Sequence, residues 1–238
     1  MFMNNEMNTS RVVTAEEAQE IVRAFMLKVY GWMSAGLMIT AIVALGTYHS
    51  KQLLELILEN RIVYFGLIIA QLGLVIWLSA RIQKMSAVTA TMVFVGYSAL
   101  TGLTLSVVFI IYTLASLSST FFVTGATFGA MAVYGTVTKR DLTSMGSFLM
   151  MGLVGMIIAS VVNMFWANET LYWITTYIGV FIFVGLTAYD AQKIKTLAAA
   201  SMQGEEAEQK ASIIGALRLY LDFINLFLLL LRVLGRRR

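Results

Sequence analysis

The sequence predicts an all-α integral membrane protein, a bundle of seven transmembrane helices with the last helix at its centre. Of the 238 residues, 59% are hydrophobic and only 13% are charged, whereas about a quarter of the residues in a soluble domain are charged. The charged residues stand in short gaps between apolar runs that can each cross a bilayer as a helix of about 20 residues. Because lipid offers no partner to a free backbone group, each run is expected to be helical.

Seven apolar runs are predicted to be the spans. They cover residues 29–48, 62–80, 86–112, 118–138, 144–166, 172–197 and 212–234. No long linker divides them, so we expect a cytoplasmic tail at residues 1–23 and one transmembrane domain at residues 24–238. Near the end of the tail, Thr14 and Glu17 have capping-box spacing, which predicts that a short amphipathic helix leads into the first span.

Composition excludes several classes of function. The chain has no cysteine, so it has no disulfide framework, thiol nucleophile or thiolate metal site. Its only histidine, His49, cannot form a zinc site without several other ligands. The net charge of +4 comes mostly from cations at the ends of apolar runs, which indicates a partner in the lipid bilayer and not in nucleic acid. We expect neither catalytic residues nor a bound cofactor.

The distribution of lysine and arginine predicts the orientation. With the N-terminus inside, the inner gaps and the inner end of the sixth run contain Arg81, Lys84, Lys139, Arg140, Lys193, Lys195 and Lys210. Before the C-terminus, the outer gaps contain only Lys51 and Arg61, and this asymmetry favours an inner N-terminus. Seven spans then place the arginines at 236–238 outside. A re-entrant last segment would avoid this, but residues 219–234 contain no glycine or proline at which the chain could turn back, which favours crossing.

Small residues at helical spacing predict close helix contacts. Gly125 and Gly129 form a GxxxG pattern in the fourth run. Ser98, Gly102 and Ser106 form a stripe with a four-residue spacing in the third run. Because such residues let helix backbones approach one another, we expect both stripes to pack within the bundle.

Two acids lie within long apolar runs, Asp190 in the sixth and Asp222 in the seventh. An ionised side chain at membrane depth costs roughly 3 kcal/mol, so such a residue is a candidate functional site. Arg218, Asp222 and Asn225 share one face of the seventh run, and Thr187 and Asp190 share one face of the sixth. A polar face of this kind is costly against lipid, which predicts that the seventh helix is wrapped by the others.

The two acids meet only if their depths match. Asp222 lies about 10 residues from the inner end of its run near Ser212, or about 15 Å along a helix. Asp190 has the same depth only if the sixth helix continues past Gln192 to about Ala200. The sequence therefore predicts such an extension.

If they meet in a poorly solvated site, the two carboxylates cannot both ionise easily, and near neutral pH they can share a proton. Loss of the proton adds a repulsion that Arg218 or another cation must balance. Carboxylate oxygens suit Ca²⁺, although two acids fall short of the usual six to eight oxygens. Asp190 and Asp222 are thus predicted to be the sensor and the metal-contacting residues of a pH-gated cation path. Alternatively, they form a structural pair, or two separate ion pairs with Lys193 and Arg218.

Three segments carry a resemblance to a known family. They are FVGLTAYDAQKIK at 183–195, LYLDFINLFLLLLR at 219–232 and TKRDLTSMGSF at 138–148. With the seven-run layout, they make the sequence similar to the Bax inhibitor-1 family. The resemblance implies a seven-helix fold with a central last helix, and a pH-sensitive Ca²⁺ leak in which Asp190 and Asp222 match a di-aspartyl sensor. The polar tail and short gaps are similar to those of bacterial members, which implies an inner membrane.

The resemblance also concerns the second span. In some members an arginine near its inner end latches to the sensor, and Arg81 lies near that place. Some members carry an acid in the middle of this span, where the present sequence has Gln71 or Ala70. This departure leaves the ion selectivity of the predicted path open.

Two other functions compete with the ion path. Some family members are linked to suppression of cell death or to modulation of a membrane-bound protease, which implies a regulatory membrane protein without ion flux. Its contact surfaces would be the N-terminal tail and the loop at 201–210. An intramembrane aspartyl protease is disfavoured, because Asp222 lacks a preceding Gly-x-Gly and the chain has no proline.

Overall fold

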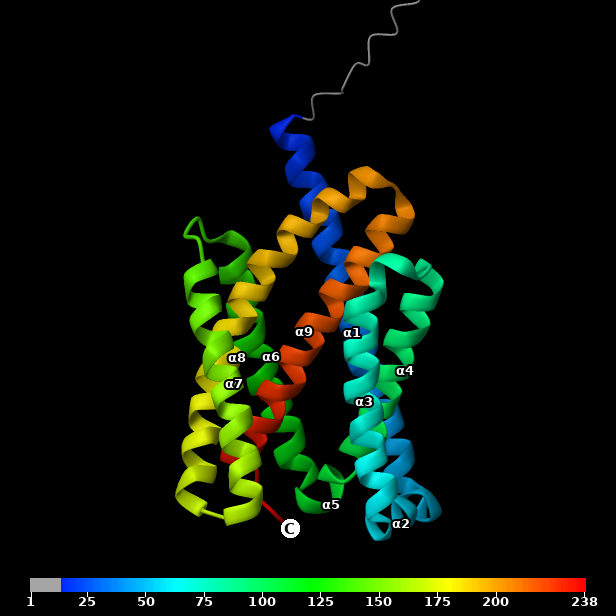
Figure 1. Cartoon of the computed structure of the whole chain (residues 1–238), viewed down its shortest axis with the longest axis vertical. Helices are drawn as coiled ribbons and strands as arrows, with labels where there is room; N and C mark the ends of the chain where they lie inside the picture. Colours follow the sequence, from blue (N-terminus) through cyan, green and yellow to red (C-terminus); the bar gives the residue numbers. More distant parts are fainter. Residues whose placement is uncertain (1–13) are drawn as a thin grey trace, which may run out of the picture.

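The computed structural model describes residues 14–238 as a bundle of long helices (Figure 1). Within this range, seven helical segments are long and apolar enough to span a membrane and no β-strand is present, which confirms the predicted all-α membrane fold. The long helices are α1 (Ala15–His49), α3 (Arg61–Arg81), α4 (Ala87–Leu105), α6 (Leu114–Val137), α7 (Thr143–Trp166), α8 (Glu169–Thr196) and α9 (Glu205–Leu234). The short elements are α2 (Lys51–Glu59), α5 (Val108–Ile111), and the 3₁₀ helices η1 (Ile82–Lys84) and η2 (Leu197–Gln203).

The first helix is longer than the predicted span at 29–48. The Glu17 N–H donates to Thr14 Oγ1 at 3.2 Å, and the Thr14 N–H donates to Glu17 Oε2 at 3.0 Å. This confirms the predicted capping box, which satisfies free N–H groups at the start of α1. The helix then continues without a break through residues 23 and 24, where the sequence suggested the end of a tail. The rest of the tail, residues 1–13, lies outside the described residues.

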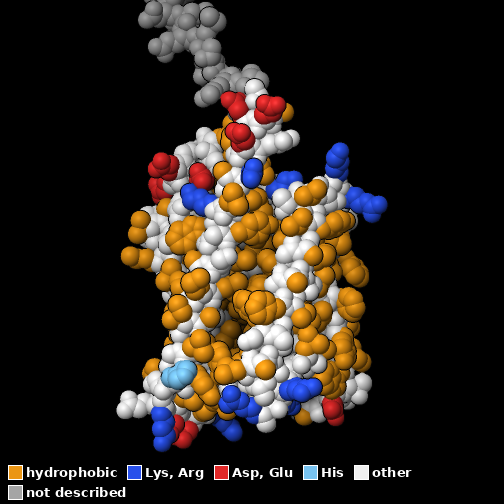
Figure 2. Space-filling view, turned by 180° about the vertical axis from the view of Figure 1, so that it is seen from behind, with side chains coloured by type: hydrophobic (Ala, Val, Ile, Leu, Met, Phe, Trp, Pro, Cys, Tyr) orange, Lys and Arg blue, Asp and Glu red, His pale blue; other side chains and the backbone are white. Residues whose placement is uncertain are grey.

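The membrane-embedded surface is clear in Figure 2, where hydrophobic side chains form a belt and most charged side chains gather at the two ends. We call the end at which α1 begins the inner end and the opposite end the outer end. Two details of the outer end differ from the prediction. The run at 86–112 is interrupted after Leu105 and forms α4 and α5. The gap between the first two spans contains α2, which begins after the cap Ser50 and buries Ile57.

The last helix is central, as predicted. In the most apolar 18-residue stretch of α9, 56% of the residues are buried, against 6% in the segment that contains α3 and 0% in α7. Helices α1, α4, α6 and α8 all pack against α9. The polar residues of α9 are thereby kept from lipid.

The chain crosses the membrane in α9 and does not re-enter. This helix runs without interruption, and the C-terminus lies at the outer end (Figure 1). There the last residues bind the turn between α5 and α6. The Thr113 N–H donates to the Arg236 carbonyl at 3.2 Å, the Arg238 N–H donates to the Ile111 carbonyl at 3.0 Å, and Arg237 forms an isolated antiparallel bridge with Tyr112.

Close helix contacts occur at only one of the two predicted small-residue stripes. A Cβ atom on Gly102 would lie 2.7 Å from the Thr40 carbonyl oxygen, so α4 and α1 pack closely there as expected. At Gly125 and Gly129 the prediction is wrong, because a Cβ would meet no described atom within 4 Å. Helix α6 instead buries the adjacent ridge that includes Thr124 and Phe128, one residue away from the two glycines.

Candidate functional site

The structure brings Asp190 and Asp222 together from α8 and α9. Helix α8 runs to Thr196 and η2 continues to Gln203, so the predicted extension past Gln192 is present. The Asp222 residue is only 4% exposed, and the Asp190 side chain is 16% exposed. The two carboxyl groups lie close enough to interact, and their charges repel when both are ionised.

Only one of the two acids has an ion-pair partner among the described residues. Arg218 Nη1 lies 3.6 Å from Asp190 Oδ1, a distance that is long for a hydrogen bond but close enough for electrostatic attraction. Arg218 is one helical turn from Asp222 on α9, so its positive charge also attracts the Asp222 carboxylate, although the two form no ion pair. Its side chain is 42% exposed, which lets solvent weaken the attraction.

The second oxygen of Asp222, Oδ2, is buried and has no hydrogen-bond donor within residues 14–238. A buried acceptor without a donor is costly, and a charged one more so. A proton held between Asp222 and Asp190 would supply the missing hydrogen bond and remove one negative charge. The pair can therefore bind one proton well and gives it up at the expense of repulsion.

The same pair offers little to a tightly bound metal. Within the described chain, no group of three or more histidine, cysteine, aspartate or glutamate side chains could hold a metal ion. Since Ca²⁺ takes six to eight oxygens when it is held firmly, two carboxylates suit an ion in transit better than a resident one.

Three other residues predicted to support the pair lie at different places. Thr187 is buried one turn before Asp190, and its hydroxyl donates to the Phe183 carbonyl at 2.7 Å. Asn225 Nδ2 donates to the Leu221 carbonyl at 2.8 Å. Arg81 ends α3 with an exposed side chain and forms no ion pair within the described residues, so the structure does not bring it to the acids.

Two further polar residues bear on the alternatives considered from sequence. Lys193 Nζ donates to the Tyr189 hydroxyl at 3.0 Å and does not pair with Asp190. Gln71 Nε2 donates to the Leu100 carbonyl at 3.2 Å and to Thr104 Oγ1 at 3.1 Å. Gln71 thus links α3 to α4.

Gln192 is a positioning residue that sequence reasoning did not assign. Its Oε1 accepts the Leu142 N–H at 2.9 Å, and its Nε2 donates to the Arg140 carbonyl at 2.8 Å. It therefore fastens the turn between α6 and α7 to α8, two residues from Asp190. In this turn the Thr143 hydroxyl and N–H donate to Asp141 and lower the pKa of its carboxyl. Two of the three resemblance motifs are thus in direct contact.

A buried pair of hydroxyl groups anchors α9 to α1 at Tyr220, two residues before Asp222. The Tyr220 hydroxyl lies 2.6 Å from the Thr40 hydroxyl, which also donates to the Ser98 carbonyl at 2.9 Å. The Tyr220 ring packs edge-on against Tyr97, with 5.8 Å between centroids. These contacts join α1, α4 and α9 in one polar network within an apolar core, and they hold α9 in rotation and depth.

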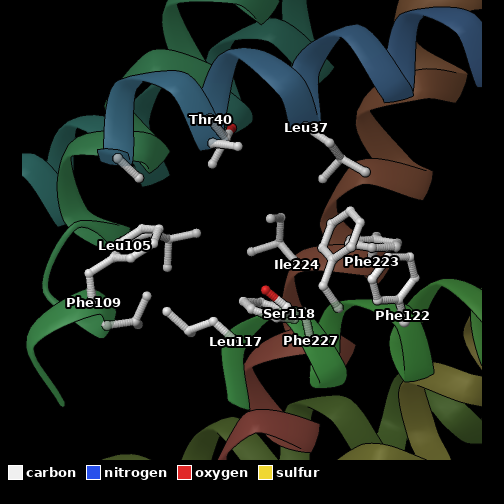
Figure 3. Close-up of a pocket in the computed structure, with 14 residues that line it drawn as sticks. Leu37, Thr40, Leu105, Phe109, Leu117, Ser118, Phe122, Phe223, Ile224 and Phe227 are labelled. Carbon is white, nitrogen blue, oxygen red and sulfur yellow. The ribbon is translucent and has the colours of Figure 1, made fainter. Parts of the chain in front are cut away.

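Two pockets flank α9 in its outer half. The first is an apolar pocket of about 400 Å³ between α1, α6 and α9 (Figure 3), and Figure 2 shows a hollow lined by hydrophobic side chains on that face. The second is an amphipathic pocket of about 640 Å³, lined by residues of α3, α4, α5, α8 and α9. Leu105, Val108 and Ile224 line both pockets, so the two pockets adjoin at these side chains.

The fold and the site define a polytopic α-helical membrane protein with two interacting acids inside its bundle. Residues 22–238 match the family model described as "Inhibitor of apoptosis-promoting Bax1". The chain therefore belongs to the Bax inhibitor-1 family, and the predicted resemblance is confirmed.

Bacterial relatives match nearly the whole chain. Inner membrane protein YbhL of Escherichia coli (strain K12) is 55% identical over 224 residues, which cover 91% of this chain and 93% of the relative. A Borreliella burgdorferi protein is 47% identical over 94% of this chain and 97% of its own length. Protein RP147 of Rickettsia prowazekii is 44% identical over 97% of this chain and 95% of its own. The predicted location in a bacterial inner membrane is confirmed. The family description and these names indicate no catalysis.

Proposed function

We propose that the protein is a pH-sensitive calcium leak in which Asp190 and Asp222 form the sensor. The observation that carries this proposal is the buried Asp222 Oδ2, which lacks a donor while Asp190 lies beside it. With a proton between the acids, α8 and α9 are bridged at this depth. Without it, two negative charges repel within the bundle and attract a cation.

Arg218 sets the balance between these two states. Its guanidinium faces Asp190 at 3.6 Å, so it offsets part of the repulsion when the proton leaves. A Ca²⁺ ion that reaches the ionised pair competes with Arg218 for the same oxygens. Because two carboxylates coordinate Ca²⁺ incompletely, the ion is not retained, as conduction requires.

The test is Ca²⁺ flux into dye-loaded liposomes across a pH series, with purified wild type, Asp190→Asn and Asp222→Asn. Asparagine keeps the shape of aspartate and cannot exchange the proton. The wild-type flux is expected to change by up to about tenfold per pH unit in its steepest region, as exchange of one proton allows. Both variants should lose this response.

The matched control is Asp141→Asn, which removes an exposed acid at the inner end and outside the spans. It should keep the wild-type pH response. A leak whose pH response ignores both intramembrane substitutions would remove the sensor, and a wild type without Ca²⁺ flux at any pH would remove the channel.

A second function is supported by the inner end of the molecule. There α1 and the η2–α9 turn extend beyond the other helices (Figure 1). The turn exposes Met202, at 63%, together with Glu205 and Glu206. Such a surface suits a regulator that binds a membrane-bound protease or another membrane protein, without ion flux of its own.

This second function predicts a separation of effects. Charge reversal at Glu205 and Glu206 should abolish regulation of the bound protein, measured as its proteolytic activity in co-reconstituted liposomes, and leave Ca²⁺ flux unchanged. Asp222→Asn should do the opposite. Regulation that survives the charge reversal and fails with Asp222→Asn would contradict the docking function.

A further inference from the structure

The amphipathic pocket at the outer end is built from opposite sides of the bundle. Its lining comes from α3, the end of α4, α5, the start of α8, the outer half of α9 and the C-terminal segment, and α3 and α8 lie on either side of α9 in Figure 1. Its volume of about 640 Å³ is that of a small-molecule site. Along α9 it extends from Arg232 to Leu221, or about 16 Å of helix.

Two arginines, Arg232 and Arg237, line this pocket. Within the part of the chain that the structure describes, neither forms an ion pair with a carboxylate. The Arg232 guanidinium lies over the Tyr172 ring, with 5.4 Å between Cζ and the centroid, and the backbone of Arg237 is bridged to Tyr112. Two cations without an acidic partner favour an anion and disfavour Ca²⁺.

The remainder of the lining is amphipathic. Gln71, Thr101 and Asn225 present amide and hydroxyl groups, while Ile68 and Leu228 present apolar surface. The pocket also lies beside α3, whose apolar side chains Ile62, Ile69 and Ile76 are exposed. A ligand that fills it must therefore combine an anionic head near the membrane surface with an apolar part at membrane depth.

We infer that Arg232 and Arg237 bind a phosphate group, and that the occupant of the pocket is an anionic phospholipid of the outer leaflet. The phosphate lies between the two guanidinium groups, which donate paired N–H groups to its oxygens. An acyl chain lies along Ile68, Leu221 and Leu228. The site does not involve Asp190 or Asp222, so it stands or falls independently of the proposed leak.

Native mass spectrometry of the detergent-purified full chain tests this site. Phosphatidylglycerol, phosphatidylcholine and inorganic phosphate are titrated separately. The wild type is expected to bind phosphatidylglycerol at least about tenfold more tightly than phosphatidylcholine. The double variant Arg232→Gln/Arg237→Gln should lose about tenfold or more of this affinity, because each arginine supplies charge-assisted hydrogen bonds.

Arg61→Gln is the matched control, because Arg61 is a cation of the outer end that does not line this pocket. It should bind phosphatidylglycerol as the wild type does. Tyr172→Leu keeps both charges and removes the ring beneath Arg232, so it should lose a smaller part of the affinity. Unchanged elution and melting temperature of each variant show that the fold is intact.

Three outcomes would overturn the inference. The double variant could bind phosphatidylglycerol as tightly as the wild type does. Arg61→Gln could lose as much affinity as the double variant, which would indicate attraction by net charge alone. Inorganic phosphate could bind as tightly as phosphatidylglycerol, which would show that a soluble anion and not a lipid occupies the pocket.

Discussion

Replacing Gly135 by alanine is expected to lower the free energy of unfolding by about 3 kcal/mol, because overpacking a close backbone contact typically costs this much. A Cβ at this position would collide with the backbone carbonyl of Ala188, where α6 crosses α8. A backbone atom cannot rotate away as the end of a side chain can, so the two helices must separate. Asp190 follows Ala188 by two residues, so the shift would also move Asp190.

The matched control for this substitution is Gly129→Ala on the same helix. A Cβ there meets no described atom within 4 Å, and alanine favours the helix by up to about 1 kcal/mol over glycine. We expect Gly135→Ala to melt about 9 °C below the wild type. Gly129→Ala should melt at or above the temperature of the wild type. The measurement is heating in detergent followed by size-exclusion chromatography. Equal melting temperatures for the two variants would show that α6 and α8 are not in close contact at Gly135.

Replacing Asp222 by asparagine is expected to stabilise the protein while it abolishes the pH response of the leak. At high pH the wild type carries two neighbouring carboxylates with one cation, Arg218, and a buried oxygen without a donor. Asparagine removes one charge, and its amide can donate to Asp190. Relief of a buried unsatisfied group is worth about 2 kcal/mol, or about 6 °C in melting temperature.

The sign of the pH dependence follows from the same geometry. A proton shared by Asp190 and Asp222 stabilises the folded wild type, so its melting temperature should fall as the pH is raised and the proton leaves. Asp222→Asn should lack this fall, and the two curves should approach each other at low pH. Asp141→Asn is the control that should keep the fall in melting temperature as the pH is raised, because it leaves the Asp190–Asp222 pair unchanged. If Asp222→Asn is less stable than the wild type at high pH, the Asp222 carboxylate has favourable partners in the native state, and the expectation is wrong.

The membrane spans and the two acids within them could be predicted from the sequence alone. Apolar length predicts membrane helices because backbone groups in lipid have no other partner. Acids within such runs are conspicuous because their burial is costly. One helical count also gave the condition for Asp190 and Asp222 to lie at the same depth, which is that the sixth helix extends past Gln192. These features depend on local pattern and on depth, both of which can be read along the chain.

Features that depend on three-dimensional neighbours could not be read in this way. The resemblance suggested Arg81 as a latch to the acids, but its exposed side chain at the end of α3 forms no ion pair within the described residues. The GxxxG pattern predicted a helix contact at Gly125, but a Cβ there would meet no described atom within 4 Å. The hydrogen bonds of Gln192 join segments about fifty residues apart, and no spacing within either segment indicates them. Rotation of α6 about its axis decides the second of these cases, and the other two depend on which distant segments meet in space.

Leu105, Val108 and Ile224 line both the apolar pocket and the amphipathic one. Helix α5, which carries Val108, is a single turn, so few backbone hydrogen bonds fix the position of this shared side chain. A change in the position of this turn would therefore alter the shape of both pockets at once.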